Sequence, residues 1–350
     1  MKIPRKLLAF LKGKDNFFIA THINPEGDAL GSAVALSMAL EAQGKKTVVY
    51  DRDIVPEFYR FLPGHERFKN STLDLQPSAF NLILLDCNSL ERAGIDGLSF
   101  KYSAVIDHHE PAPLCQPRHG LALRSGAGYR EHGRGGARPG TEENFGDIRW
   151  VEPEAAATGM MIFYLIKEIG LKITRDIAIN LYSAIAVDTG TFRYSNTTAE
   201  VLKVGAELIA AGASPAYISN HLYETWSNER FALLIMALNS IEIRDEIAMT
   251  VVTTRMYKKT GTGHEDTENF SNFPRMMKDI KISAFFREIG NNYWKVSLRS
   301  RGDINVATVA ALFKGGGHRN ASGYKIKASL ESAKESLIKV VKSESKGVRS

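Results

Sequence analysis

The first half of the chain alternates short apolar runs with helical patterns, and this alternation limits the possible folds more than any other feature. Four runs have the length and composition of strands, namely NFFIATHI, KKTVVYD, NLILLDCN and YSAVIDHH at residues 16–23, 45–51, 81–88 and 102–109. Between the first two, DALGSAVALSMALEAQG has helical spacing until Gly44 ends it. Apolar strands separated by helices indicate a parallel sheet with helices on both faces. We therefore predict an α/β fold.

The second half of the chain predicts a further, smaller domain. Helical patterns continue in PEAAATGMMIFYLIKEIG (153–170) and RDIAINLYSAIAVDTGTF (175–192). Beyond them, β-rich runs joined by a GNN turn indicate an α/β domain with a mixed sheet. The predicted organisation is a catalytic domain at 1–204, a helical connector at 205–240 and a smaller domain at 241–350.

The net charge of +6 is weak evidence for a polyanion-binding face, because most of it lies in one segment. Residues 111–140 hold five arginines and a single acid, Glu131. This stretch is rich in Gly and Pro and has no hydrophobic periodicity, so we predict a disordered insertion. The alternative is an arginine-rich flap that attracts phosphate or RNA.

The sequence favours a cytoplasmic protein without a membrane partner. No apolar run reaches the roughly 18–20 residues that span a bilayer. The N-terminal LLAFL is too short for the apolar core of a signal peptide. The two cysteines, Cys87 and Cys115, form neither a disulfide framework nor a metal-ligand spacing, which fits a reducing compartment.

Polar side chains follow three of the predicted strands at the point where each strand ends. His22 comes after the first strand and Asp86 after the third. Asp107, His108 and His109 come at the end of the fourth. Because ligands of open parallel sheets bind beyond the carboxyl ends of the strands, we expect these side chains to lie close together.

Three further acids belong to the same predicted edge. Glu26 and Asp28 open the helix after the first strand, and Asp188 ends a later helix. Each acid alone has an ordinary alternative role, as Asp28 has in capping its helix. Together, however, so many carboxylates and imidazoles repel one another unless cations neutralise them. Mixed nitrogen and oxygen ligands suit Mn²⁺, Mg²⁺, Fe²⁺ or Zn²⁺, and the lack of thiolates argues against a structural zinc.

These segments resemble the motifs of a known family. HINPEGDALGS, LLDCN, VIDHH and AVDTGTF, in this order and spacing, resemble the four motifs of the DHH phosphoesterases. GGGHRNASG, at 315–323, resembles the glycine-rich signature of their DHH-associated second domain. The resemblance covers nearly the whole chain apart from 111–140. The two-domain length looks most like the branch that degrades very short oligoribonucleotides and dephosphorylates 3′-phosphoadenosine-5′-phosphate (pAp).

The resemblance implies a two-ion site, typically with Mn²⁺ and with Mg²⁺ or Co²⁺ as substitutes. The implied ligands of one ion are His22, Glu26 and Asp86, and those of the other are Asp28, Asp86, His108 and Asp188. Asp86 would thus bridge the two ions. Asp107 would accept a ring N–H and orient a histidine, and His109 would face the substrate phosphate. Glu26 departs from the family, which usually has Asp at this position.

The second domain is expected to bind the substrate. Successive glycines allow backbone amides to approach a phosphate closely, and Arg299 could grip a terminal phosphate through two hydrogen bonds. The alternative is a flexible turn beside a solvated arginine. The predicted substrate-binding residues are Arg299, Ser300, Gly316, Gly317, His318, Arg319 and Asn320.

We therefore predict a phosphoesterase that hydrolyses short RNA or DNA oligonucleotides and the nucleoside bisphosphate pAp through two-metal activation of water. A homodimer is the assembly considered. The enzymatic alternatives are a cyclic- or linear-dinucleotide phosphodiesterase, a RecJ-like single-strand exonuclease and a family II pyrophosphatase. The non-enzymatic alternative is a nucleotide- or RNA-binding module with a degenerate metal site, which Glu26 and the insertion keep open.

Overall fold

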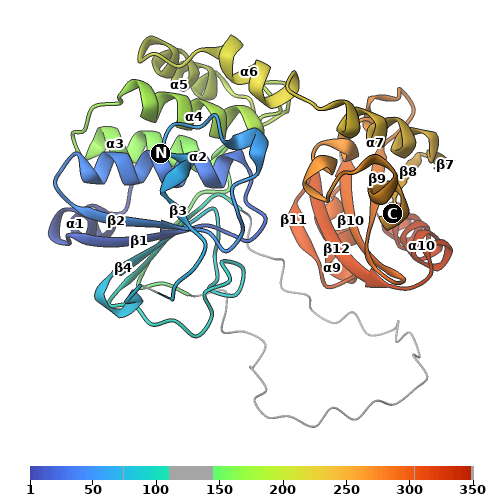
Figure 1. Ribbon diagram of the computed structural model, residues 1–350, viewed down its shortest axis with the longest axis horizontal. Coiled ribbons are helices and arrows are strands. Elements are labelled where there is room, and N and C mark those ends of the chain that lie inside the picture. The colour runs from blue at the N-terminus through green and yellow to red at the C-terminus, as the bar shows by residue number, and fades with distance from the viewer. Residues whose placement is uncertain (74, 110–144, 303, 348–350) are drawn as a thin grey trace, which may run out of the picture. The chain divides into compact units, whose positions relative to one another are not determined.

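The computed structural model describes residues 1–73, 75–109, 145–302 and 304–347, which form two compact units (Figure 1). The first unit ends at Thr225 and the second begins at Trp226. This division falls within the 205–240 segment that the sequence marks as a connector. The stretch predicted to be an insertion, 111–140, lies outside the described residues.

The first unit contains a six-stranded parallel sheet with helices, which confirms the predicted α/β class. The strands are β1 (Asn16–Ala20), β2 (Lys46–Tyr50), β3 (Phe68–Lys69), β4 (Asn81–Leu85), β5 (Ser103–Asp107) and β6 (Ile148–Val151). They lie in the order β3-β2-β1-β4-β5-β6, and every neighbouring pair is parallel. The order changes direction between β1 and β4, which is where sheets of this kind bind ligands.

Helices cover one face of this sheet. Helices α1 (Arg5–Gly13), α2 (Gly27–Glu41) and α3 (Thr158–Glu168) contact the strands. Helix α4 (Arg175–Asp188) packs on α2 and α3, and α5 (Ala199–Ala210) and α6 (Pro215–Tyr223) pack on α4. Figure 1 shows α2 and α3 next to the strands, with α4 and then α5 farther from the sheet. Phe17 and Ile19 of β1 point into this core, and their neighbours Phe18 and Ala20 point to the other face.

The second face of the sheet is packed differently from the prediction of helices on both faces. Among the described residues, it is covered mainly by the 87–100 segment, which contributes Ala93 and Ile95 to its core, and Leu75 and Phe80 also pack there. This segment forms turns rather than a helix. Gly94 and Gly97 adopt left-handed backbone conformations there, which interrupts regular helix.

Close packing of α2 on α4 sets the position of two predicted site residues. A Cβ at Gly31 would lie 2.4 Å from the carbonyl oxygen of Asn180, so only glycine allows the two helices to approach this closely. Asp28 lies one turn before Gly31 in α2, and Asp188 is the last residue of α4. The helix contact therefore holds both carboxylates over the same end of the sheet.

The second unit contains a mixed sheet, as predicted. Its elements are α7 (Asn228–Asn239), β7 (Glu242–Arg244), β8 (Ile247–Val252), α8 (Thr254–Thr260), β9 (Ile282–Gly290), β10 (Tyr293–Ser300), α9 (Val306–Leu312), β11 (Gly316–His318), β12 (Ala321–Lys327) and α10 (Leu330–Gly347). The strand order is β11-β12-β10-β9-β8-β7. The β8–β9 pair is parallel and the other neighbours are antiparallel. Helices α9 and α10 pack on one face, and α7 packs on the other.

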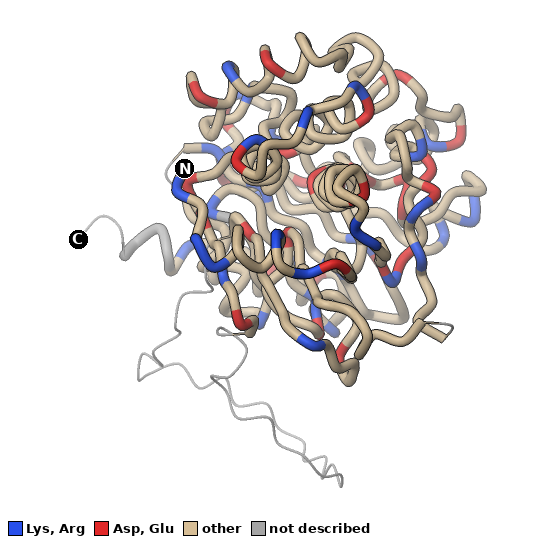
Figure 2. Tube along the Cα trace, turned by 90° about the vertical axis from the view of Figure 1, so that its left-hand side faces the viewer, with Lys and Arg blue, Asp and Glu red and all other residues tan. Residues whose placement is uncertain are grey.

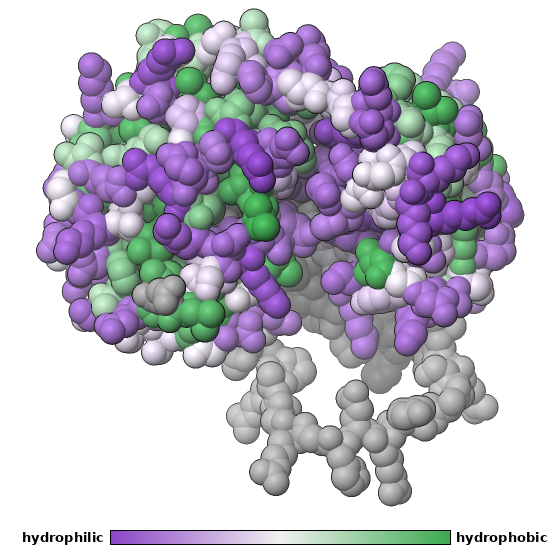
Figure 3. Space-filling view, viewed as in Figure 1, coloured by the Kyte–Doolittle hydropathy of each residue, from purple (hydrophilic) through white to green (hydrophobic). Residues whose placement is uncertain are grey.

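Charged and hydrophilic residues are distributed over the surface of both units. Figure 2 shows Lys and Arg interspersed with Asp and Glu along the described trace. Figure 3 shows a mainly hydrophilic face with small, separate hydrophobic areas. None of the described helices is by itself long and apolar enough to cross a membrane, and the one pair that passes together, α5 with α6, is bent by 105°.

Candidate metal centre and active site

The carboxyl edge of the first sheet gathers seven of the predicted site residues. They follow three neighbouring strands or occupy the ends of two helices that pack above them. The residues are His22, Asp28, Asp86, Asp107, His108, His109 and Asp188. Their side chains are linked by a continuous set of contacts no longer than 3.6 Å.

Asp86 lies at the centre of the cluster. Its Oδ2 is 3.4 Å from Nε2 of His22, whereas its Oδ1 is 3.4 Å from both Nε2 of His108 and Nδ1 of His109. The residue adopts a left-handed backbone conformation, with φ of 57°. Apart from glycine, Asp and Asn tolerate this conformation best, and of these only Asp supplies a carboxylate. The sharp turn after β4 thus leaves the two oxygens of Asp86 facing different histidines.

Two histidines present the same ring nitrogen to the carboxylates. Nδ1 of His108 lies 3.1 Å from the carbonyl oxygen of Ala155, and Nδ1 of His22 lies 3.1 Å from that of Ile23. When Nδ1–H donates to a carbonyl, a neutral imidazole carries its lone pair on Nε2. In both residues Nε2 faces carboxylate oxygens, so a proton or a metal ion must lie between them.

Asp28 connects the cluster to the start of α3. Its Oδ2 accepts a hydrogen bond from the backbone N–H of Thr158 (2.7 Å), and its Oδ1 accepts one from that of Gly159 (2.8 Å). The sequence pattern predicts a helix from residue 153, but α3 begins at Thr158. The preceding Ala157 offers no side-chain cap, so the Asp28 carboxylate supplies the cap from another part of the chain.

The charges in the cluster depend strongly on one another. Burial, together with the charges of Asp86 and Asp188, raises the pKa of Asp28 well above its usual value. Burial would also raise the pKa of Asp86, but His109, His108 and His22 hold it well below its usual value. Burial would lower the pKa of His108, yet Asp188 and Asp86 raise it well above the ordinary range. Without another cation, these shifts favour protons on Asp28 and His108, which offset the negative charge of Asp86.

The donor atoms fit divalent cations. One group of closely spaced ligand atoms comes from Asp86, His108 and His109, and a second comes from Asp28, His108 and Asp188; within each, the atoms lie within 4.8 Å of one another. Such mixed nitrogen and oxygen sets suit divalent first-row metals. His108 appears in both groups but has one lone pair to give through Nε2. A carboxylate has two oxygens, so Asp86 is the residue suited to bridge two ions.

The remaining predicted site residues of this unit differ in their surroundings. Asp107 is buried, and its Oδ1 lies 2.7 Å from Nδ1 of His109 and accepts the backbone N–H of the same residue. A substrate would therefore meet His109 through Nε2. Glu26 is exposed at the first position before α2 and belongs to neither group of ligand atoms. Metal binding by Glu26 stays a prediction.

Thr158 is a buried residue of the site that the sequence analysis missed. Its hydroxyl donates to Oδ1 of Asp86 (3.1 Å), and its backbone N–H donates to Asp28. It thus orients two of the candidate ligands at once. A single Thr inside a helical pattern gives no sequence signal for this role, because the pattern does not show where the helix begins.

In the second unit, two predicted substrate-binding residues contact each other. The Ser300 hydroxyl is buried, and its oxygen lies 2.7 Å from the carbonyl oxygen of Ile304 and 3.1 Å from Oδ1 of Asn320, which share its one proton. The Ser300 N–H also donates to the carbonyl oxygen of Asn320. These bonds join the end of β10 to the glycine-rich segment. Arg299 is half-buried, directly before Ser300 in β10, and pairs with Ala321 of β12.

The glycines of β11 have different environments. A Cβ at Gly317 would lie 2.6 Å from the carbonyl oxygen of Ala321, and φ at this residue is +134°, so glycine is required by the fold. A Cβ at Gly316 would meet nothing within 4 Å. The backbone of Arg319 accepts a hydrogen bond from Val306, whereas the side chain of His318 lies outside the described residues.

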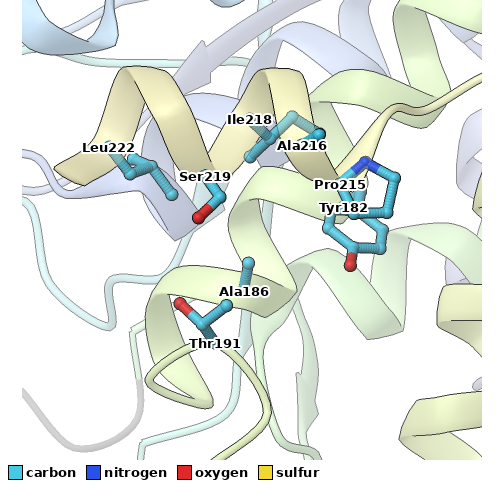
Figure 4. Close-up of a pocket in the computed structure, with 8 residues that line it drawn as sticks. All are labelled: Tyr182, Ala186, Thr191, Pro215, Ala216, Ile218, Ser219 and Leu222. Carbon is cyan, nitrogen blue, oxygen red and sulfur yellow. The ribbon is translucent and has the colours of Figure 1, made fainter. Parts of the chain in front are cut away.

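A pocket of about 290 Å³ lies between α4 and α6 of the first unit (Figure 4). It is lined mainly by apolar groups, among them Tyr182 and Ala186 of α4 and Ile218 and Leu222 of α6. None of the predicted site residues lines it. We therefore assign it no part in the candidate metal centre.

Comparisons with known proteins identify related sequences and folds. The model of the DHH family N-terminal domain matches residues 16–123, and that of the DHHA1 domain matches residues 248–347. A solved structure described as an exopolyphosphatase-related protein from Bacteroides fragilis is similar with a TM-score of 0.80 and 25% identity. The alignment covers 99% of this chain and 97% of that one.

Two curated relatives carry the name bifunctional oligoribonuclease and PAP phosphatase NrnA. The protein from Thermus thermophilus is 31% identical over 346 residues, covering 98% of this chain and 94% of the relative. The protein from Bacillus subtilis is 25% identical over 324 residues, covering 89% and 90%. The similarity thus extends over both units.

The contact between Thr158 and Asp86 generates a first prediction. Thr158→Val removes the hydroxyl at nearly constant volume, so Asp86 is held less firmly and the affinity for a divalent cation falls by about 10–100-fold. Thr158→Ser keeps the hydroxyl, so its affinity for the cation should stay close to that of the wild type. The rise in melting temperature with added cation measures the affinity. Equal cation dependence of the Val variant and the wild type would contradict this role.

The histidines generate a prediction about pH. Burial opposes protonation of His22, but the hydrogen bond and charge of Asp86 raise its pKa from 6.5 to about 9. Between these values the metal-free site holds a proton that an ordinary histidine has lost, so cation binding releases protons and tightens as pH rises. Calorimetry at about pH 7.5 in buffers of different protonation enthalpy measures this release. His22→Asn should release fewer protons; an enthalpy independent of the buffer would refute the expectation.

Proposed function

The chain belongs to the DHH family of phosphoesterases, and from this membership we propose that it hydrolyses short oligoribonucleotides and pAp. Both substrates contain a phosphate ester of a ribose oxygen. The proposal follows the names of the relatives from Thermus thermophilus and Bacillus subtilis, which match the chain over nearly its full length.

The arrangement around Asp86 is the observation that carries the proposal. One of its oxygens faces His22, and the other faces His108 and His109. A carboxylate shared in this way suits a pair of ions that act on one phosphoryl group. A structural ion pair would need a single histidine, not three around one buried acid.

Each of the chain's own residues has a role in the proposed reaction. Bound divalent ions would supply positive charge, which lowers the pKa of water so that hydroxide is available to attack phosphorus and which offsets the negative charge of the phosphoryl oxygens. Asp86 and His108, both buried at the carboxyl edge of the sheet, would bind these ions. His109, oriented by Asp107, can donate a proton from Nε2 to the ribose oxygen as its bond to phosphorus breaks.

The second unit is proposed to bind the rest of the substrate. Arg299 provides a planar donor that matches a phosphate, and the open space beside Gly316 allows the backbone to approach a ligand. Ser300 and Asn320 support this segment through their mutual hydrogen bonds. Binding of the nucleotide away from the scissile bond would favour substrates only a few residues long.

The finer features of this function are proposals as well. We propose Mn²⁺ as the ion, as the resemblance to the DHH phosphoesterases implies; the mixture of imidazole nitrogen and carboxylate oxygen is compatible with it. We propose the cytoplasm as the compartment, in keeping with the free, buried thiol of Cys87. A homodimer is the proposed assembly.

The activity is tested by offering several phosphate compounds to the purified chain with Mn²⁺. We expect hydrolysis of RNA dimers to pentamers and of pAp, with slower cleavage of a 24-mer and none of pyrophosphate. Asp86→Asn should lower kcat/KM more than about 100-fold, since even residues behind metal ligands cost about 10–100-fold. Asp96→Asn, an exposed change after the same strand, is the matched control.

The same panel, with cyclic di-AMP added, discriminates between the alternatives. Preferential cleavage of cyclic di-AMP would indicate a dinucleotide phosphodiesterase, and processive cleavage of the 24-mer would indicate a RecJ-like exonuclease. Binding of RNA without hydrolysis of any compound would support the non-enzymatic alternative. Full activity of Asp86→Asn would contradict the central role of this carboxylate.

The role of β11 generates a separate prediction. Gly316→Ala adds a Cβ in open space, so the free energy of unfolding should change by less than about 0.5 kcal/mol. If substrate approaches this backbone, KM for pAp rises while kcat changes little. Gly317→Ala, by contrast, should destabilise the fold by about 1–3 kcal/mol. Unchanged KM in Gly316→Ala would exclude close contact between β11 and the substrate.

A further inference from the structure

A carboxylate outside the predicted site lies on the same edge of the first sheet. Asp51 follows β2, is fully buried and stands beside the extension of β1. Its Oδ2 accepts a hydrogen bond of 2.5 Å from the hydroxyl of Thr21. The N–H of Thr21 in turn donates to the carbonyl oxygen of Tyr50. Asp51 therefore fixes the residue that directly precedes His22.

The other oxygen of Asp51 supports the end of the same turn, at Asn24, through Asp53. Its Oδ1 accepts the backbone N–H of Asp53 (2.8 Å), and Oδ2 of Asp53 accepts the backbone N–H of Asn24 (2.6 Å). Asn24 adopts a left-handed conformation, with φ of 57°, which turns the chain sharply after His22. The two carboxylates thus hold the 21–24 turn at both ends.

His22 lies between these two anchors. The turn is also held from the β4 side, where the N–H of Ile23 donates to the carbonyl oxygen of Arg92 (2.9 Å). The ring of His22 points Nε2 at Asp86 and keeps Nδ1 near the carbonyl of Ile23. Metal ligands lose affinity when the groups that orient them are removed, so the geometry of this turn controls what His22 can bind.

We propose that Asp51 is a positioning residue that acts through Thr21 and Asp53 to fix His22 as a ligand for a divalent ion shared with Asp86. The proposal rests on the proposed function, which requires an ion at this place. The second group of candidate ligands is held by different contacts. Asp28 is held by Thr158 and Gly159, and His108 by the carbonyl of Ala155. Disturbing the 21–24 turn should therefore lower the affinity for one ion and leave the affinity for the other unchanged.

Titration of the full chain with Mn²⁺, monitored by isothermal calorimetry, tests the proposal. We expect two binding steps in the wild type. Thr21→Val, which removes only the hydroxyl, should weaken one step by about 10–100-fold and leave the other within about twofold. Thr21→Ser should restore it. The control is Thr47→Val, which removes a comparable hydroxyl-to-carboxylate bond, to Glu41, at the other end of β2.

Two further variants separate geometry from charge. In Asp51→Asn, the amide oxygen can accept the Asp53 N–H while the amide nitrogen donates to the Thr21 hydroxyl, so both steps should stay within about threefold of the wild type. Asp53→Ala, at a half-buried position, should weaken the same binding step as Thr21→Val. It replaces Thr21→Val in the test if Thr21→Val does not fold. Wild-type affinities in folded Thr21→Val and Asp53→Ala overturn the proposal. Loss of a step in Asp51→Asn as large as in Thr21→Val also overturns it, because charge would then matter more than position.

These measurements read binding without hydrolysis, so they distinguish the two proposals. A wild-type chain that binds two ions but cleaves no phosphate ester would contradict the proposed function, and the variant series would still decide the role of Asp51. A wild-type chain that binds a single ion would overturn the role of Asp51.

Discussion

The hydrogen bonds from the start of α3 to Asp28 determine much of the first unit. A helix begins with backbone N–H groups that have no partner within the helix, and a nearby negative charge stabilises them. Here the accepting oxygens come from Asp28 of α2, over a hundred residues earlier in the chain. The bond places the first turns of α2 and α3 against each other. It also holds a carboxylate beside His108, so one contact contributes to both the fold and the site.

The cluster beyond the sheet edge is a balance of opposite charges in a buried place. Asp28, Asp86 and Asp188 lie around the same imidazole and would repel one another if all were ionised without a partner. Protonated histidines can supply the missing charge, and divalent ions can supply it better. The repulsion in this cluster lowers the stability of the metal-free chain, and bound divalent cations relieve it.

The local pattern of the sequence could predict a large part of this arrangement, because strand ends in a parallel sheet share one edge. That rule predicts that His22, Asp86 and His108 lie close together. The start of α3 could not be predicted, since the alanines before Thr158 favour helix and the cap comes from Asp28. The roles of Thr158 and Asp51 could not be predicted either, because they depend on contacts with distant segments. The turns that cover the second sheet face depend on left-handed glycines that the pattern did not reveal as such.

The double role of Asp28 has a consequence for reading related sequences. A chain that lost its chemistry would be released from keeping His22 or His109, but it would still need an acceptor for the first turn of α3. Asp28 would persist in such a descendant as part of its architecture. An acid at this position therefore says little about whether a relative is an active enzyme, and the histidines are the better markers.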